Sequence, residues 1–301
     1  MIFSACSRRK KANPDPALHP RELPVGTVQA VATRWHDLVE AARKPFLATS
    51  LYGGRAFTDA AWSARATGCS HYIISAGLGL IAPEQPIPAY ALTTAGATDE
   101  NVLYRCPVGA QPVDWWRNAF AGNQIAQAMS AAPGRIYLAM PKTYVEMILE
   151  DLMALDPETT AKLRIFTGAG ETLRNTVLAR NVLPYDARLD GPDSPLPGTK
   201  SDFASRALRH FVVLTQNEPY LDLDGDTALV KRALEPMRLP DLPIRQRASD
   251  ETIRAALVRS WASANGNRQK LLRHLRDDLL ISCEQSRFAR IARELQNEGS
   301  V

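Results

Sequence analysis

The segment that most constrains the fold runs from His71 to Tyr90, HYIISAGLGLIAPEQPIPAY. Its first four residues are a β-branched and aromatic run, too short for a helix and followed by small residues, which predicts an inner strand of a sheet. Glycines after a strand let the backbone turn sharply or approach a ligand, and the prolines of the segment oppose both helix and ladder formation. We therefore expect a stiff, extended lip beside the carboxyl end of the strand, where open α/β sheets bind ligands.

Strands and helices alternate along the first two thirds of the chain. This alternation predicts an α/β fold, a three-layer α/β/α arrangement around a mostly parallel central sheet. The divisions that we expect are a core over 1–220, a proline-rich linker over 221–248 and a small helical domain over 249–301. The predicted strands are 2–6, 71–74, 135–139 and 163–166, and the predicted helices are 25–44, 56–67, 113–131, 201–215 and two that begin near 141 and 171.

The last part of the chain is expected to be helical throughout. Helices are predicted near 251–264, 268–279 and 284–297, with Asn265–Gly266–Asn267 as the first turn. Short helices separated by tight turns and rich in arginine are consistent with a helix-turn-helix element that binds DNA. A plain helical cap on the core explains the same pattern equally well.

The charge and the cysteines narrow the class of protein. A formal net charge of +4 permits a nucleic acid or another anionic partner without requiring one. The 4 cysteines form no CxxC pair, so we expect neither a zinc site nor a disulfide framework, and a reduced, cytoplasmic setting follows. The basic run after the first strand is the reverse of the order in a signal peptide, and no apolar run is long enough to span a membrane. The aspartates of DLDGDT resemble a calcium loop without its closing glutamate, so no metal and no cofactor are expected.

Several chemistries are excluded by the motifs that the sequence lacks. It contains no GxxxxGK[ST], no GxGxxG after a strand, no HExxH and no GxSxG. ATP hydrolysis, dinucleotide binding and zinc proteolysis are therefore not indicated.

Cations gather in the predicted strand-end loops. Arginine offers a bidentate fork to phosphate oxygens, and loop amides add further donors. A solvated basic loop is the alternative for such a run. The residues expected to contact phosphate or DNA are Ser7, Arg8, Arg9, Lys10, Lys142, Lys200, Arg206 and His210.

Aromatic residues beside glycines are candidates for holding a nucleobase. Stacking contributes roughly 1 to 3 kcal/mol per base, and glycines let the backbone approach. Packing in the core explains Tyr52 and Phe57 equally well, whereas Tyr90 on the lip is less readily explained in that way. The residues expected to bind the base are Tyr52, Arg55, Phe57, Ser75 and Tyr90.

Carboxylates concentrate between residues 171 and 202. Cleavage of an N-glycosidic bond passes through an oxocarbenium-like centre, so a carboxylate that activates water or screens the charge is expected. Asp202 is the preferred catalytic residue because it lies in the first turn of a helix beside Lys200, and Asp190 and Glu171 are the other candidates. Turn formation for the aspartates and the helix dipole for Glu171 are the alternatives.

The sequence ISAGLGLIAPEQPIPAYALT resembles a signature of the bacterial peroxide-stress YaaA-type proteins and of the related DUF6884-like proteins. The opening CSRRK is similar to their serine-to-lysine motif, and LYGGRAF resembles the segment between the two. Together the matches span residues 1 to 95. The resemblance implies a fold related to the uracil-DNA glycosylases, which handle nucleobases at the carboxyl edge of the sheet. The loop SRRKK lacks the carboxylate of those enzymes, so the catalytic group has moved to 171–202 or the protein binds without catalysing.

We therefore expect a DNA glycosylase that removes a modified base, of the hypermodified kind found in phage DNA, and leaves an abasic site. Base flipping into a pocket with a basic rim is the expected mode of DNA recognition, and anti-phage defence is the expected role by analogy. Two alternatives remain open. One is an enzyme that cleaves the same bond in free nucleotides, and the other is a DNA-binding stress protein without catalytic activity.

Overall fold

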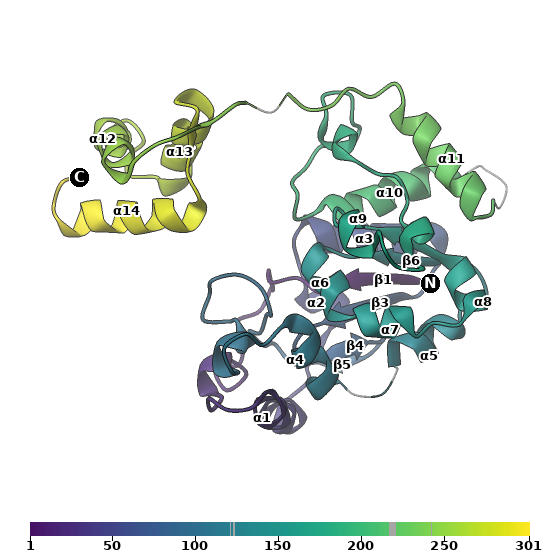
Figure 1. Ribbon diagram of the computed structural model, residues 1–301. Coiled ribbons are helices and arrows are strands. Elements are labelled where there is room, and N and C mark those ends of the chain that lie inside the picture. The colour runs from purple at the N-terminus through teal and green to yellow at the C-terminus, as the bar shows by residue number, and fades with distance from the viewer. Residues whose placement is uncertain (121, 123, 217–220, 242) are drawn as a thin grey trace. The chain divides into compact units, whose positions relative to one another are not determined.

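The computed structural model describes residues 1–120, 122, 124–216, 221–241 and 243–301. The chain forms two compact units, the first from Met1 to Pro240 and the second from Asp241 to Val301 (Figure 1). Within the described part of the chain, no helix combines the length and the apolar character needed to cross a bilayer.

A five-stranded sheet in the order β4-β3-β1-β6-β7 forms the centre of the first unit. Strand β1 pairs in parallel with β3 and β6, and β6 pairs in parallel with β7, whereas β4 is antiparallel to β3. This confirms a mixed α/β unit with a mostly parallel sheet, and β3 is an inner strand as expected. The strands are β1 (Ile2–Ala5), β3 (His71–Ser75), β4 (Gly79–Ile81), β6 (Ile136–Ala139) and β7 (Leu163–Phe166).

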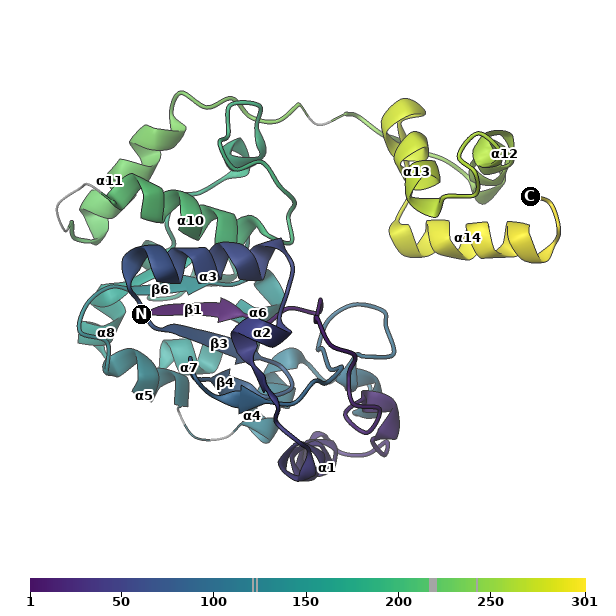
Figure 2. The ribbon, with the colours of Figure 1, turned by 180° about the vertical axis from the view of Figure 1, so that it is seen from behind.

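Helices cover both faces of this sheet. Helices α3 (Arg55–Thr67) and α10 (Phe203–Thr215) pack against each other on one face, and α4, α5 and α7 lie on the other (Figures 1 and 2). Helix α1 (Val28–Ala41) packs on α4. The remaining helices of this region are α2 (Ala48–Leu51), α4 (Pro112–Ala119), α5 (Gln124–Ser130), α6 (Lys142–Met147), α7 (Leu149–Met153), α8 (Pro157–Lys162) and α9 (Gly170–Leu173).

The inner strands are apolar at successive positions because both of their faces are buried. In β1, Ile2 packs in the cluster on the α10 side and Phe3 in the cluster on the α4 side. In β6, Leu138 and Ala139 divide between the same two clusters. Side chains of a strand alternate between the faces of a sheet, so each inner strand contributes to both cores.

The lip and the helix predicted over 113–131 differ from the prediction. The lip was expected to form no ladder, but Pro86–Ile87 is a short strand, β5, which pairs with β2 (Phe46–Leu47) in an antiparallel manner. A proline is tolerated there because the ladder is short and at an edge. The helix predicted over 113–131 is divided into α4 and α5, and Gly122 between them has a φ of 118°, which favours glycine.

The predicted linker begins too early. Residues 223–234 form helix α11 (Leu223–Leu234), and its Leu223, Val230 and Leu234 are buried in the same cluster as Phe211 of α10. The apolar face of α11 therefore belongs to the first unit, which extends to Pro240.

The second unit has a hydrophobic core of its own. Helix α12 (Asp250–Trp261) ends in a turn where Asn265 and Gly266 have positive φ, and α13 (Arg268–Arg273) continues as a π-helical turn, His274–Asp278. Helix α14 (Gln285–Asn297) packs on both α12 and α13, and β8 (Gln246–Arg247) pairs in parallel with β9 (Ile281–Ser282). The principal core residues are Ile253, Leu257, Leu271, Leu275, Phe288, Ile291 and Leu295.

Candidate functional site

A pocket of about 470 Å³ lies past the carboxyl ends of β1 and β6, and we call it the strand-end pocket. The chain leaves β1 toward β3 on one side, whereas β6 lies on the other side of β1. The order of strands therefore reverses at this point, which is where open α/β sheets bind ligands. The lining residues are Cys6, Ser7, Arg8, Arg9, Gly54, Arg55, Ala56, Thr93, Ala95, Pro141, Thr143, Tyr144, Ser201 and Asp202.

Three arginines and the start of a helix make the rim of this pocket positive. Arg9 is exposed, and among the described residues its guanidinium forms no ion pair. Arg8 pairs with Glu100 at 3.1 Å, and Arg55 lies 3.5 Å from Asp59. Helix α3 begins at Arg55, and the positive end of a helix dipole favours an anion. The rim is suited to a phosphate.

Asp202 is a carboxylate of the strand-end pocket. It is the N-cap residue of α10, and its Oδ1 accepts hydrogen bonds from the backbone N–H of Thr199 at 2.8 Å and from Nε of Arg206 at 2.6 Å. Both bonds go to the same oxygen, and no described residue donates to Oδ2. The side chain is held in a fixed orientation while one oxygen stays available to accept a proton.

A second pocket of about 580 Å³ lies past β6 and β7, and we call it the adjoining pocket because it shares Pro141 and Ser201 with the first. Lys142 and Lys200 line it, and Lys142 also pairs with Glu146 at 3.5 Å. Asp190 lines it too, but its carboxylate accepts from Nη2 of Arg206 at 2.5 Å. The fold thus brings several of the predicted cationic and acidic residues to one edge of the sheet. They are Arg8, Arg9, Arg55, Lys142, Lys200, Asp190 and Asp202.

The predicted base-binding aromatics lie in the core. Tyr52 and Tyr90 are 1% and 0% exposed, and their hydroxyls lie 2.8 Å apart. Ser75 is also buried, with its Oγ 2.5 Å from the Tyr90 hydroxyl, and Phe57 packs beside Tyr52. These four residues therefore do not face a ligand, and of the predicted base-binding set only Arg55 lines the strand-end pocket.

The small residues of the turn at 75–79 pack against the protein's own aromatic side chains. A Cβ added to Gly77 would lie 2.6 Å from the Tyr90 ring, and Trp35 donates from its indole N–H to the Gly77 carbonyl at 2.6 Å. The Trp115 indole N–H donates to the carbonyl of Ala76 at 2.7 Å. Small residues are required in this turn because aromatic side chains pack closely against its backbone, whereas the strand-end pocket lies past β1 and β6.

Lys10 differs from its predicted role as a phosphate ligand. Its ammonium lies 4.3 Å from the centre of the Tyr90 ring, and burial lowers the pKa of the amine. Below it, the thiol of Cys6 lies 3.0 Å from the Tyr144 hydroxyl. Burial, followed by the proximity of Cys6, raises the pKa of Tyr144, so the phenol stays protonated at neutral pH. Cys6 and Tyr144 are pocket residues that our prediction missed: Cys6 is the last residue of the first predicted strand, and Tyr144 lies in the first turns of the helix that follows β6.

Three further residues that were predicted to be functional line neither the strand-end pocket nor the adjoining pocket. Arg206 is fully buried and, besides Asp202 and Asp190, donates to backbone carbonyls, so it organises the loop before α10 and does not contact DNA. His210 is 5% exposed, and its Nδ1 lies 3.0 Å from the Tyr185 hydroxyl. The Glu171 side chain is 87% exposed, pairs with Arg174 and lines neither pocket.

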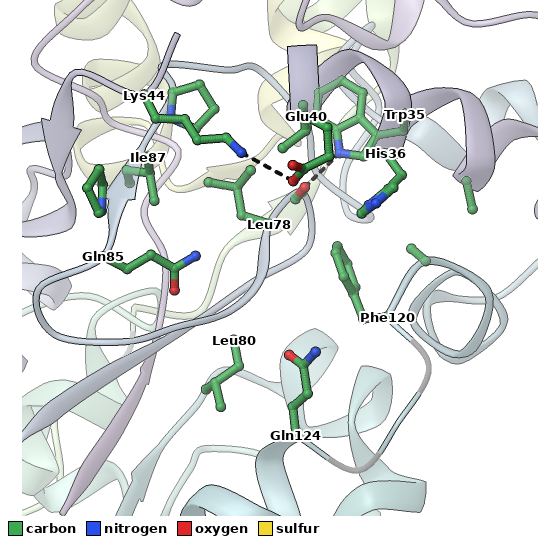
Figure 3. Close-up of a pocket in the computed structure, with 16 residues that line it drawn as sticks. Trp35, His36, Glu40, Lys44, Leu78, Leu80, Gln85, Ile87, Phe120 and Gln124 are labelled. Carbon is green, nitrogen blue, oxygen red and sulfur yellow. Dashed lines mark hydrogen bonds and ion pairs between the residues drawn. The ribbon is translucent and has the colours of Figure 1, made fainter. Parts of the chain in front are cut away.

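A third pocket, of about 470 Å³, lies beside the edge strand β4 (Figure 3). Helix α1 provides Glu40, which pairs with Lys44 at 3.2 Å, while Leu80 of β4 and Phe120 form part of the apolar wall. The lip supplies Gln85. The lip therefore borders this pocket and not the strand-end pocket.

Among the described residues, no cluster of three or more histidine, cysteine, aspartate or glutamate side chains is arranged to hold a metal ion. We found no protein-family model, no curated protein and no solved structure that matches the chain.

Proposed function

We propose that the protein is a DNA N-glycosylase and that the target nucleotide enters the strand-end pocket. The observation that carries this proposal is the position of the pocket at the reversal of strand order, with Arg9 on its rim and Asp202 in its wall. A pocket of about 470 Å³ is within the size range of small-molecule sites. Kinship of the first unit with the uracil-DNA glycosylases belongs to the same proposal and is supported by the resemblance of residues 1–95.

In the proposed reaction, Arg9 and the start of α3 bind the phosphate next to the target base, and Asp202 acts on water. Oδ2 of Asp202 accepts a proton as the water oxygen bonds to C1′ of the sugar, while the N-glycosidic bond breaks and the base leaves with the bonding electrons and takes up a proton. Arg206 and the Thr199 amide hold the carboxylate in place. The products are a free base and an abasic site, the chemistry expected of a protein that acts on modified phage DNA.

The test is base release from DNAs that carry different modified pyrimidines, with the free base identified by mass spectrometry. Asp202→Asn is expected to lower the rate about 100- to 10,000-fold, as for loss of a general base. Glu171→Gln is the matched control, because its side chain is 87% exposed and outside the pocket, and it should retain the full rate. Unchanged release by Asp202→Asn would contradict the assigned role.

Asp202 forms an ion pair with the buried Arg206, so a lower rate of base release by Asp202→Asn could also result from a less stable fold. Arg9 is exposed and its side chain forms no hydrogen bond or ion pair with a described residue, so Arg9→Ala should leave thermal stability nearly unchanged. It is expected to raise KM for DNA and to lower the salt slope of binding by about one. Release from free nucleosides at the same rate as from DNA would favour the free-nucleotide alternative, and DNA binding without release from any substrate would favour the non-catalytic one.

A further inference from the structure

The second unit exposes helical surfaces of different character. The exposed side chains of α12 include Glu251, and those of α13 and its π-helical extension include Asp277 and Asp278. The carboxylate of α14 itself, Glu294, has a side chain that is 40% exposed and pairs with Arg254 and Arg290, and the exposed Glu284 and Glu298 cap the two ends of the helix. Its exposed residues are Gln285, Ser286, Arg290, Arg293, Gln296 and Asn297.

Helix α14 is held firmly enough to present this face. Its Phe288, Ile291, Ala292 and Leu295 are buried and recur at helical spacing, so they fix the rotation of the helix about its axis. The end of α14 is also joined to α13, because Nη2 of Arg268 donates to the Gln296 side chain at 2.5 Å.

Not all cations of the unit are available to a partner. Arg290 is bound to Asp250 at 2.5 Å and to Glu294 at 2.9 Å, so its charge is largely neutralised. Arg293 forms no ion pair with any described residue, and the same is true of Lys270 and Arg273 on the exposed side of α13. These are the charges that an anionic partner would meet.

We propose that the second unit binds duplex DNA with α14 in the major groove. Arginine, glutamine and asparagine are the side chains that read guanine and adenine edges there, and the carboxylates that border this face, Asp250 and Glu294, are both paired with arginines. The 13 residues of α14 extend about 20 Å, enough to cross a groove about 12 Å wide. Arg293 contacts base edges, while Lys270 and Arg273 contact phosphates. This inference stands independently of the proposed glycosylase activity.

The first test measures affinity and salt dependence of the full chain for a mixed-sequence duplex by fluorescence anisotropy. Lys270→Ala and Arg273→Ala should each lower the salt slope by about one. Arg232→Ala, which also removes an exposed charge but from α11 of the first unit, is the control and should leave the slope unchanged. Equal effects of all three variants, or tighter binding of the single strand than of the duplex, would overturn the inference.

The second test asks whether α14 reads sequence. Duplexes bound by the full chain are selected from a random library and sequenced. Arg293→Ala should lower affinity for the preferred duplex about 5- to 150-fold and relax the preference at its base. Because Arg293 has no ion pair within the described chain, this variant should fold normally, which circular dichroism checks. An identical selected sequence from native and variant chains would refute the role of α14.

The two proposals fail in different ways. If base release is absent from every DNA but duplex binding depends on Lys270 and Arg293, the glycosylase proposal fails and this one stands. If base is released but these variants bind duplex as the native chain does, the reverse holds.

Discussion

Replacing Asp226 with alanine should be among the most destabilising single changes in the first unit. Asp226 is 0% exposed, and its two oxygens accept from Nε of Arg164 at 2.6 Å and from Nη2 of Arg135 at 2.8 Å. These bonds join the start of α11 to the amino ends of β6 and β7. Removing one partner of a buried ion pair costs about 3 to 5 kcal/mol, because a charge is left in a poorly solvated site.

The same helix provides the control. Asp224 also lies in the first turn of α11, so both variants lose a similar interaction with the helix dipole. Its side chain is 86% exposed and lies 3.8 Å from Arg180, a surface pair worth less than about 1 kcal/mol. Asp224→Ala should therefore unfold nearly as the native chain does.

Urea unfolding followed by tryptophan fluorescence measures the difference. Trp261 is the tryptophan of the second unit, so a Trp261→Phe background reports on the first unit alone. In that background Asp226→Ala should lower the urea concentration at the midpoint of unfolding, with little change in the dependence of the unfolding free energy on urea concentration. The midpoint temperature of thermal unfolding should fall by about 6 to 20 °C. If the free energies of unfolding of the two aspartate variants differ by less than about 1 kcal/mol, the buried ion pairs of Asp226 do not stabilise the first unit as argued.

Two further predictions concern the sheet and its turn. Burial lowers the pKa of His71 to about 4, so the neutral ring is favoured by folding, and about 3 kcal/mol of stability present above pH 6.5 should be lost as the pH falls to about 4. His71→Gln should abolish this dependence in unfolding measured across that range, and an unchanged profile would refute the assignment. Gly77→Ala should cost about 1 to 3 kcal/mol, because the new Cβ would lie 2.6 Å from the Tyr90 ring. Gly134→Ala, with nothing within 4 Å, is the control in the same unfolding assay, and equal stability of the two variants would contradict the packing argument.

Local pattern predicted the repeating part of the fold. The strands β1, β3, β6 and β7 were found from short apolar runs, and α3 and α10 from the glycines and capping residues that precede them. Such signals depend on neighbours within a few residues. The strands β4 and β5 were missed because glycine and proline are poor strand formers, and only their pairing with β3 and β2 makes them strands.

Part of the pocket rim was also visible in the sequence. A loop that follows a parallel strand must lie at the carboxyl edge, so recognising β1 was enough to predict that Ser7 and Arg9 lie at that edge, where both line the strand-end pocket. Asp202 was selected because it begins a helix beside Lys200, and it lines the same pocket. Nothing in the local sequence indicated that Tyr144 would join them.

The sequence by itself determined the order along the chain of the principal strands and helices and which loops reach the carboxyl edge of the sheet, because both depend on local propensity and chain direction. Only the tertiary structure decided which polar and aromatic groups are buried. Tyr90 was expected on an exposed lip, yet it fills the turn at Gly77, and Arg206 was expected to meet phosphate, yet it is enclosed by Asp190 and Asp202. Burial and ion pairing depend on residues distant in the chain, such as Asp226 and Arg164, so no window of sequence contains them.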